Sequence, residues 1–199
     1  MLRKGLIAFF WSLAFLATPA SAQFSDSYNF LKAVRDRDGT KATKYLSEPG
    51  NVIIDTRDIV TGETALHIVV KGRDLQWINF LLARGAKTEQ RDKDGNTPLI
   101  VAARMRFAEA ATALLRAKAA VDGTNPSGET PLIAAVQLRD QAMVRLLLDN
   151  GANPDKRDTL SGQSARDYAR NDTRGTTILK IIEEPRAKPK AAASMGPKL

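Results

Sequence analysis

A five-residue phrase returns at a fixed interval along this chain. It begins at Gly62, Gly95 and Gly128, a step of 33 residues each time, and its third and fifth residues are always Thr and Leu. A leucine pair keeps the same period later in each unit, at Leu81-Leu82, Leu114-Leu115 and Leu147-Leu148. A unit this short cannot bury its own apolar face, so its copies must stack and present an extended surface.

The phrase predicts the start of a helix. Thr97 and Thr130 each precede a proline, and a threonine in this place accepts a hydrogen bond from an unpaired N–H of the first helical turn. Proline at the first helical position loses no hydrogen bond, and the glycine two residues before the threonine tolerates the positive φ of a tight turn. A second helix follows, with apolar residues at three- and four-residue steps, and Gly85 or Gly151 ends it. Lys118 replaces that glycine in the third unit, which predicts a weaker stop there.

The segment Thr64-Ala65-Leu66-His67-Ile68-Val69 matches the T-P-L-H-x-A signature of ankyrin repeats, and Pro98 and Pro131 restore the proline in the next two copies. From Ser25 to Glu184 the chain resembles the ankyrin-repeat family. The resemblance implies an all-α repeat fold, an ankyrin solenoid of helix-turn-helix repeats joined by β-turn or hairpin loops. It implies about five repeats, including a degenerate cap at each end.

Both ends of the stack depart from the phrase, as terminal repeats do. Near the N-terminus two helices are predicted, from Tyr28 to Arg37 and from Thr40 to Ser47, and an apolar helix around residues 178–182 closes the array. The predicted divisions are a signal peptide at 1–22, a capping repeat at 23–57, repeats at 58–91, 92–124 and 125–157, a closing repeat at 158–184 and a disordered basic tail at 185–199.

The first 22 residues have the three-part layout of a secretory signal peptide. Arg3 and Lys4 precede an apolar run from Leu6 to Leu16, and small residues end at Ala22, where cleavage is expected. The alternative is an uncleaved membrane anchor, but the run is shorter than the roughly 20 residues that span a bilayer. Export to a bacterial periplasm is therefore predicted, with secretion as the alternative and with no stable membrane insertion after cleavage.

Composition argues against catalysis and against a metal site. The chain has no cysteine, and His67 is its single histidine. The resemblance gives His67 hydrogen bonds among neighbouring loops, the alternative being a general base. Asp92-Lys93-Asp94-Gly95 is similar to the start of a calcium loop, yet Thr97-Pro98 begins a helix where further ligands are required. No phosphate-binding or nucleophile motif occurs. We therefore expect no enzyme activity, no cofactor and no metal.

Charge gives little support for nucleic-acid binding. The net charge of the chain is +8, but two basic residues lie in the predicted signal peptide and four in the tail. Trp77 lies in an apolar helical segment, where packing between repeats is favoured over stacking on a ligand. The tail is either an inert end or a basic tether to an anionic surface.

The resemblance implies that a protein partner, of unknown identity, binds the concave face of the stack. It places that face at Val60, Thr61, Glu63, Lys71, Lys93, Asp94, Asn96, Arg104, Met105, Pro126, Ser127, Glu129, Gln137 and Leu138. Arg104 and Met105 are the predicted anchors, because a methionine beside arginines suits a partner with apolar and acidic features. The hypothesis is a monomeric, non-catalytic interaction module in the bacterial envelope, acting as an accessory or regulatory factor. The alternatives are a secreted effector that binds a host protein and an envelope tether.

Overall fold

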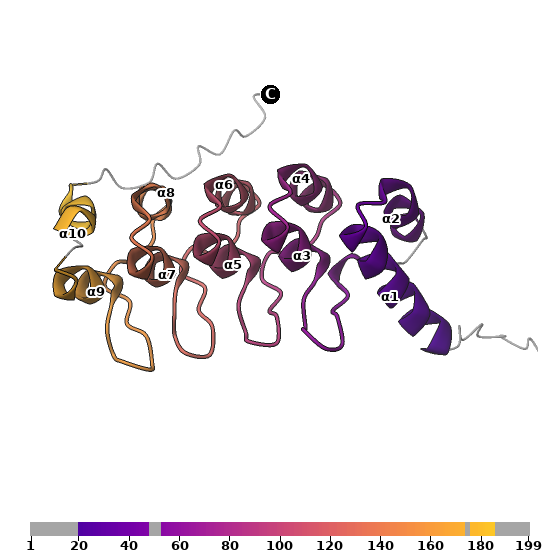
Figure 1. The fold of residues 1–199 in the computed structure, drawn as a ribbon, viewed down its shortest axis with the longest axis horizontal. Coiled ribbons are helices and arrows are strands. Elements are labelled where there is room, and N and C mark those ends of the chain that lie inside the picture. The colour runs from indigo at the N-terminus through magenta and orange to yellow at the C-terminus, as the bar shows by residue number, and fades with distance from the viewer. Residues whose placement is uncertain (1–19, 48–52, 174–175, 186–199) are drawn as a thin grey trace, which may run out of the picture.

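The computed structural model describes residues 20–47, 53–173 and 176–185, and these residues form a row of stacked helix pairs (Figure 1). One layer holds the first helix of each pair and the other layer the second, while long loops project from the first layer. The described part contains ten α-helices, one 3₁₀ turn and no named strand. Their bounds are α1 Ala20–Arg35, α2 Gly39–Leu46, η1 Ile53–Asp55, α3 Ala65–Lys71, α4 Leu75–Ala83, α5 Pro98–Arg104, α6 Ala108–Arg116, α7 Pro131–Gln137, α8 Gln141–Asp149, α9 Ala165–Asn171 and α10 Thr176–Glu183. The predicted all-α solenoid is confirmed.

The inner helices α3, α5, α7 and α9 start where the repeated phrase predicts. The Thr130 hydroxyl accepts a hydrogen bond from the Ile133 N–H at 3.1 Å, and Thr97 does the same for Ile100 at 3.4 Å. Pro98 and Pro131 hold the first positions of α5 and α7. The upstream glycines Gly62, Gly95 and Gly128 have φ angles of +67°, +77° and +74°, which side-chain-bearing residues rarely adopt.

The outer helices α2, α4 and α8 start on a different cap. Asp38, Asp74 and Asp140 precede them, and each carboxylate accepts a backbone N–H from the first turn. Phe107 stands in this place before α6, and no side chain caps that helix. Lys118 takes the positive φ that Gly85 and Gly151 take after α4 and α8, so α6 ends at the same point of its repeat.

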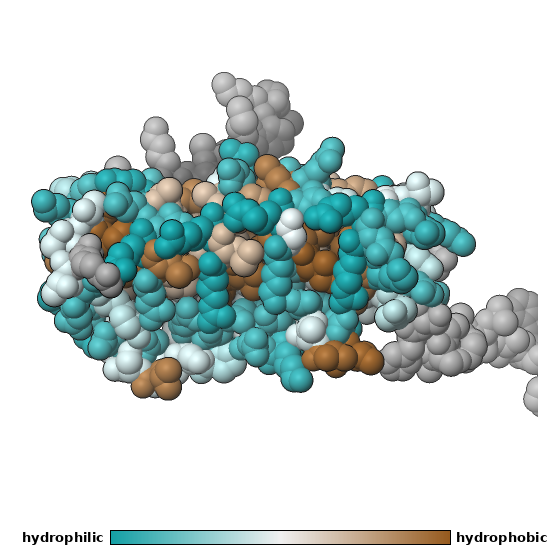
Figure 2. Space-filling model, in the orientation of Figure 1, coloured by the Kyte–Doolittle hydropathy of each residue, from teal (hydrophilic) through white to brown (hydrophobic). Residues whose placement is uncertain are grey.

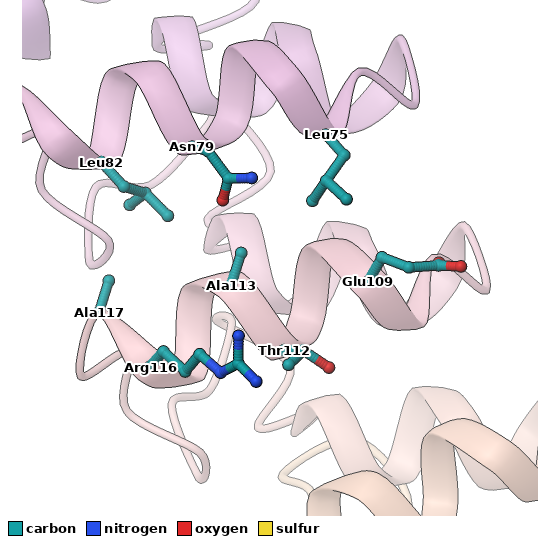
Figure 3. A pocket seen from close by; sticks show the side chains of 8 residues that line it. All are labelled: Leu75, Asn79, Leu82, Glu109, Thr112, Ala113, Arg116 and Ala117. Carbon is teal, nitrogen blue, oxygen red and sulfur yellow. The ribbon is translucent and has the colours of Figure 1, made fainter.

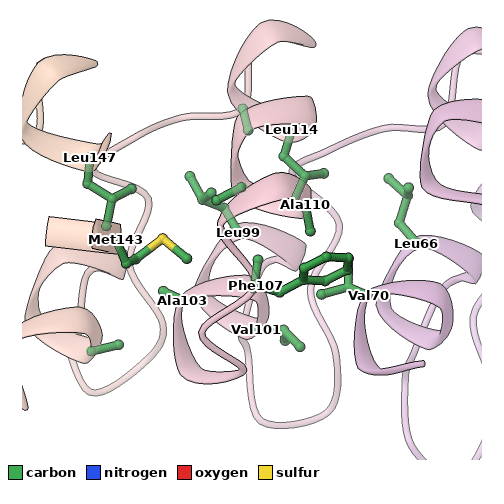
Figure 4. Close-up of a cluster of buried hydrophobic side chains, with 14 of the residues drawn as sticks. Leu66, Val70, Leu99, Val101, Ala103, Phe107, Ala110, Leu114, Met143 and Leu147 are labelled. Atoms are coloured by element: carbon green, nitrogen blue, oxygen red, sulfur yellow. The ribbon is translucent and has the colours of Figure 1, made fainter. Parts of the chain in front are cut away.

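The core runs continuously between the two layers. Leu66, Leu99 and Leu132, the last residues of the three phrases, are at most 1% exposed. Among the second helices, α8 buries large side chains such as Met143 and Leu147, whereas α6 buries mainly alanines. Phe107 fills part of that difference, because its ring is buried beside Val70 of the preceding repeat (Figure 4).

The N-terminal pair differs from its prediction. Helix α1 begins at Ala20 rather than Tyr28 and ends at Arg35 rather than Arg37. It ends early because Arg37 has a φ of +57°, which a helix cannot contain. The helix crosses the predicted cleavage point after Ala22, and cleavage there stays a prediction. The signal-peptide residues 1–19 and the tail from residue 186 lie outside the described residues.

Candidate protein-binding surface

Each projecting loop is held by one polar residue at its base. Asp58 accepts hydrogen bonds from the backbone N–H groups of Val60 and Thr61, at 2.9 and 3.0 Å. The Thr61 N–H, the Arg35 guanidinium and the Val60 N–H together lower the pKa of Asp58 to about 2. Residues in the equivalent place bond in the same way within the later loops, namely Asp92, Asn125 and Asp158. The loops are therefore preformed rather than waiting for a partner to order them.

Neighbouring loops are also bonded to one another. The Lys93 N–H donates to the Thr61 carbonyl at 2.9 Å, and the Thr159 N–H donates to the Ser127 carbonyl at the same distance. Backbone bonds thus join the first loop to the second and the third to the fourth. The second and third loops are joined instead by the Asn125 amide, which donates to the Asn96 side chain, because Pro126 has no N–H.

Charged groups at the ends of the inner helices are already paired. The Lys71 Nζ lies 2.5 Å from a Glu63 carboxylate oxygen. The Arg104 guanidinium donates to both carboxylate oxygens of Glu129, through Nε and through Nη2. Arg104, one of the two predicted anchors, must therefore leave Glu129 or share it before it can bind an outside carboxylate.

Met105, the other predicted anchor, is 38% exposed, and its carbonyl accepts a hydrogen bond from Arg73 Nη1 at 2.7 Å. Most other predicted contact residues are exposed as well: Val60, Thr61, Lys71, Lys93, Asp94, Arg104, Pro126, Ser127 and Gln137. Glu63, Glu129 and Leu138 are half-buried.

Asn96 is wrongly placed among the contact residues, because it is only 3% exposed. Its carbonyl oxygen lies 2.9 Å from His67 Nε2, and its side-chain oxygen accepts from Asn125 Nδ2 at 3.1 Å. Its amide nitrogen donates to the Asp92 carboxylate at 3.3 Å. Asn96 joins three elements of the interior and has no surface to offer a partner.

His67 is fully buried in the same network. Its Nδ1 lies 3.2 Å from the Thr64 backbone nitrogen and 2.9 Å from the Thr64 hydroxyl. Because Nε2 faces the Asn96 carbonyl, the imidazole proton belongs on Nε2, and Nδ1 accepts. Burial lowers the pKa of His67, which favours this neutral form. The geometry supports a structural role over a general base.

Apolar side chains stand at the loop tips, where the sequence analysis named only Val60. Ile59 is 90% exposed, Val60 66% and Leu160 86%. Figure 2 shows hydrophobic groups at the lower edge of the molecule, set apart by hydrophilic surface. The sequence does carry a signal for these positions. Turns that face water favour polar residues, so an apolar residue close to the loop glycine indicates an exposed apolar group.

A shallow groove lies on the outer layer between α4 and α6 (Figure 3). Leu75, Asn79 and Leu82 point toward it from α4, and the α6 side contributes short side chains such as Ala113. Its full lining comprises Leu75, Asn79, Leu82, Glu109, Thr112, Ala113, Arg116 and Ala117. Trp77 lies elsewhere, half-buried against the core, with its ring 5.4 Å from that of Phe80. This placement supports packing rather than stacking on a ligand.

Among the described residues 20–47, 53–173 and 176–185, no group of three or more His, Cys, Asp or Glu side chains could hold a metal ion. No helix within the same ranges combines the length and the apolar character needed to cross a bilayer.

The family model described as ankyrin repeats (3 copies) matches residues 30–125 and 66–158. Oxysterol-binding protein homolog 1 of Saccharomyces cerevisiae is similar, at 34% identity over 86 residues. That match covers 42% of this chain and 7% of the yeast protein, so this chain spans a small part of that relative.

Proposed function

The chain belongs to the ankyrin-repeat family, whose repeats generally mediate protein–protein interactions and are typically non-catalytic, and we propose that it binds a partner protein through its loop tips and inner helices. Fold alone does not name the partner, so the proposal rests on the surface. No substrate pocket or cofactor is part of it.

Exposed apolar side chains on a preformed surface carry the proposal. Ile59 and Val60 stand at one loop tip, Leu160 at another, and Met105 at the end of α5. The loops that display them are tied by hydrogen bonds within and between repeats. Binding through such residues costs little ordering entropy, and a few apolar anchors can supply most of the affinity.

We further propose that the chain acts in a bacterial periplasm, as a monomeric accessory or regulatory factor. The predicted signal peptide supports export, and the absence of cysteine means that the exported chain relies on packing. A secreted effector that binds a host protein is the alternative. Comparing the periplasmic fraction with the culture supernatant separates the two, and recovery mainly in the supernatant would favour the effector.

A tether through the basic tail at 185–199 is the third candidate, supported by four basic residues among Pro, Ala and Gly. Deleting residues 185–199 should abolish envelope attachment if the tail is the tether. Unchanged attachment would leave the repeat surface as the site of binding.

The binding proposal is tested with residues 23–199 as bait in an envelope extract. A variant with Ile59→Ser, Val60→Ser and Met105→Ala removes three of the exposed apolar groups and leaves Leu160 in place, while Arg104 keeps its Glu129 partner. Tyr28→Ser is the matched control, because Tyr28 is also a large exposed side chain, 64% accessible, but lies on α1. The expected result is a protein retained by the natural bait and by Tyr28→Ser but lost from the triple variant. Retention of the same proteins by all three baits would refute this placement.

A further inference from the structure

An arginine recurs in the turn between the inner and the outer helix of the first four helix pairs. Arg37, Arg73, Arg106 and Arg139 hold equivalent places, and all have positive φ angles, between +52° and +57°. Each guanidinium reaches the next turn along the stack. We call these four residues the arginine row.

The two outer members of the row are neutralised. Arg37 Nε lies 2.7 Å from an Asp74 carboxylate oxygen, and Arg139 Nε lies 2.5 Å from one of Asp172. Burial alone would raise the pKa of Asp74, but hydrogen bonds from Arg37 and from the Trp77 backbone outweigh burial and lower it. The Asp172 hydrogen bond raises the pKa of Arg139. Each end of the row therefore carries a paired charge.

The two middle members are not neutralised in this way. Phe107 occupies the place that Asp38, Asp74 and Asp140 hold in the other turns, so Arg73 meets an aromatic ring, 4.7 Å from its Cζ, instead of a carboxylate. Arg73 also donates to the Met105 carbonyl, and Arg106 donates to the Leu138 carbonyl. Within the described residues, neither arginine forms an ion pair with a carboxylate.

Two adjacent positive charges thus lie beside an exposed apolar group. A guanidinium has five N–H donors. The carbonyls of Met105 and Leu138 accept from only some of the donors of Arg73 and Arg106, so other donors stay available to a partner. Met105 directly precedes Arg106 in the chain, and its carbonyl accepts the hydrogen bond from Arg73. Its side chain is 38% exposed. Arginine beside methionine is well suited to carboxylates flanking an apolar side chain.

We propose that Arg73, Met105 and Arg106 bind a short acidic, extended segment of a partner protein. This inference rests on the proposed function and names the chemistry of the partner. Helices of adjacent repeats pack about 10 Å apart. An extended chain rises about 3.3 Å per residue, so acidic residues about three positions apart match the two arginines. The neutralised ends limit the row to two open charges, which favours a short acidic segment over a nucleic acid or a membrane surface.

The test pans residues 23–199 against random 12-residue peptides displayed on phage. The variant is Arg73→Gln with Arg106→Gln. The matched control is Arg37→Gln with Arg139→Gln, which removes two members of the same row together with their ion pairs. Enriched peptides should carry Asp or Glu around an apolar residue. Their synthetic copies should bind the Arg73/Arg106 variant about tenfold more weakly and the control within about twofold, by fluorescence anisotropy.

Several results would overturn the proposal: no enriched peptide, enriched peptides without acidic residues, or equal losses in the two variants. Melting temperatures of both variants show whether a loss reflects unfolding. Binding of a single-stranded oligonucleotide or of phosphatidylglycerol vesicles, without peptide binding, would assign the row to polyanions instead. If a captured partner depends on Ile59, Val60 and Met105 but tolerates the loss of Arg73 and Arg106, this inference fails while the proposed function stands.

Discussion

Gly128 lies where one loop passes close to the backbone of the next, so replacing it with alanine should measure how strongly the loops are coupled. Its φ is +74°, and a Cβ placed there would lie 2.5 Å from the Thr159 backbone nitrogen and 2.9 Å from the Asp158 Cα. Positive φ costs an alanine about 1–2 kcal/mol. Overlap with backbone atoms that cannot rotate away adds about 1–3 kcal/mol. The Thr159 N–H to Ser127 carbonyl bond crosses the same gap and is weakened as well, a loss of about 1 kcal/mol.

Gly162 provides the matched control. It holds the equivalent place one loop later, with a φ of +68°, but a Cβ there would meet nothing within 4 Å. Gly162→Ala therefore costs the φ strain alone, reduced by the lower entropy of the unfolded alanine chain, or about 1 kcal/mol. With the same reduction, Gly128→Ala should cost about 2–5.5 kcal/mol in total.

The assay is urea unfolding followed by circular dichroism, with the slope compared between variants, because a repeat array can lose cooperativity when one interface weakens. Equal costs at Gly128 and Gly162 would refute the reasoning, since only the turn conformation would then matter. A larger cost at Gly162 would contradict it still more directly.

Three further predictions concern acid sensitivity and the third repeat. Because burial lowers the pKa of His67 below its ordinary value of 6.5, the stability from its neutral form is complete above that value and is lost as the pH falls toward the lower folded-state pKa. Urea unfolding at about pH 7.5 and about pH 5.5 should show a larger decrease for the natural chain than for His67→Leu, and parallel decreases would contradict this. Lys118→Gly should raise the free energy of unfolding by about 0.5–1 kcal/mol, because Lys118 has a φ of +68°, whereas any loss of stability would show that the lysine side chain matters more. Amide exchange should be faster in α6 than in α8, because α6 lacks a side-chain cap and buries mainly alanines. Equal protection of the two helices, measured by mass spectrometry, would overturn that expectation.

Much of the fold could be predicted from the sequence because its determinants are local. Thr97 and Thr130 cap helices, and Gly95 and Gly128 take positive φ, through atoms within a few residues of themselves. The period of 33 residues then sets the stacking, since the same apolar face returns once per repeat. The early end of α1 was missed because a single arginine, Arg37, adopts a conformation that its residue type does not favour.

The candidate surface could be predicted only in part. The resemblance to ankyrin repeats placed Val60, Met105 and their neighbours on the concave face, and both of these residues are exposed. It could not show that Asn96 is buried, since the groups that enclose it come from His67 and Asn125, each 29 residues away. Nor could it show that Arg104 is paired with Glu129, 25 residues along the chain.

The sequence by itself determined the repeat, the starts of the inner helices α3, α5, α7 and α9 and the turns before them, because capping and backbone preference act within a few residues. Only the tertiary structure decided which side chains are exposed and which charges are free. The arginine row makes the difference plain, because Arg37 finds Asp74 one repeat along, whereas Arg73 finds Phe107. Whether a charge remains open to a partner thus depends on a residue that stacking alone brings opposite it.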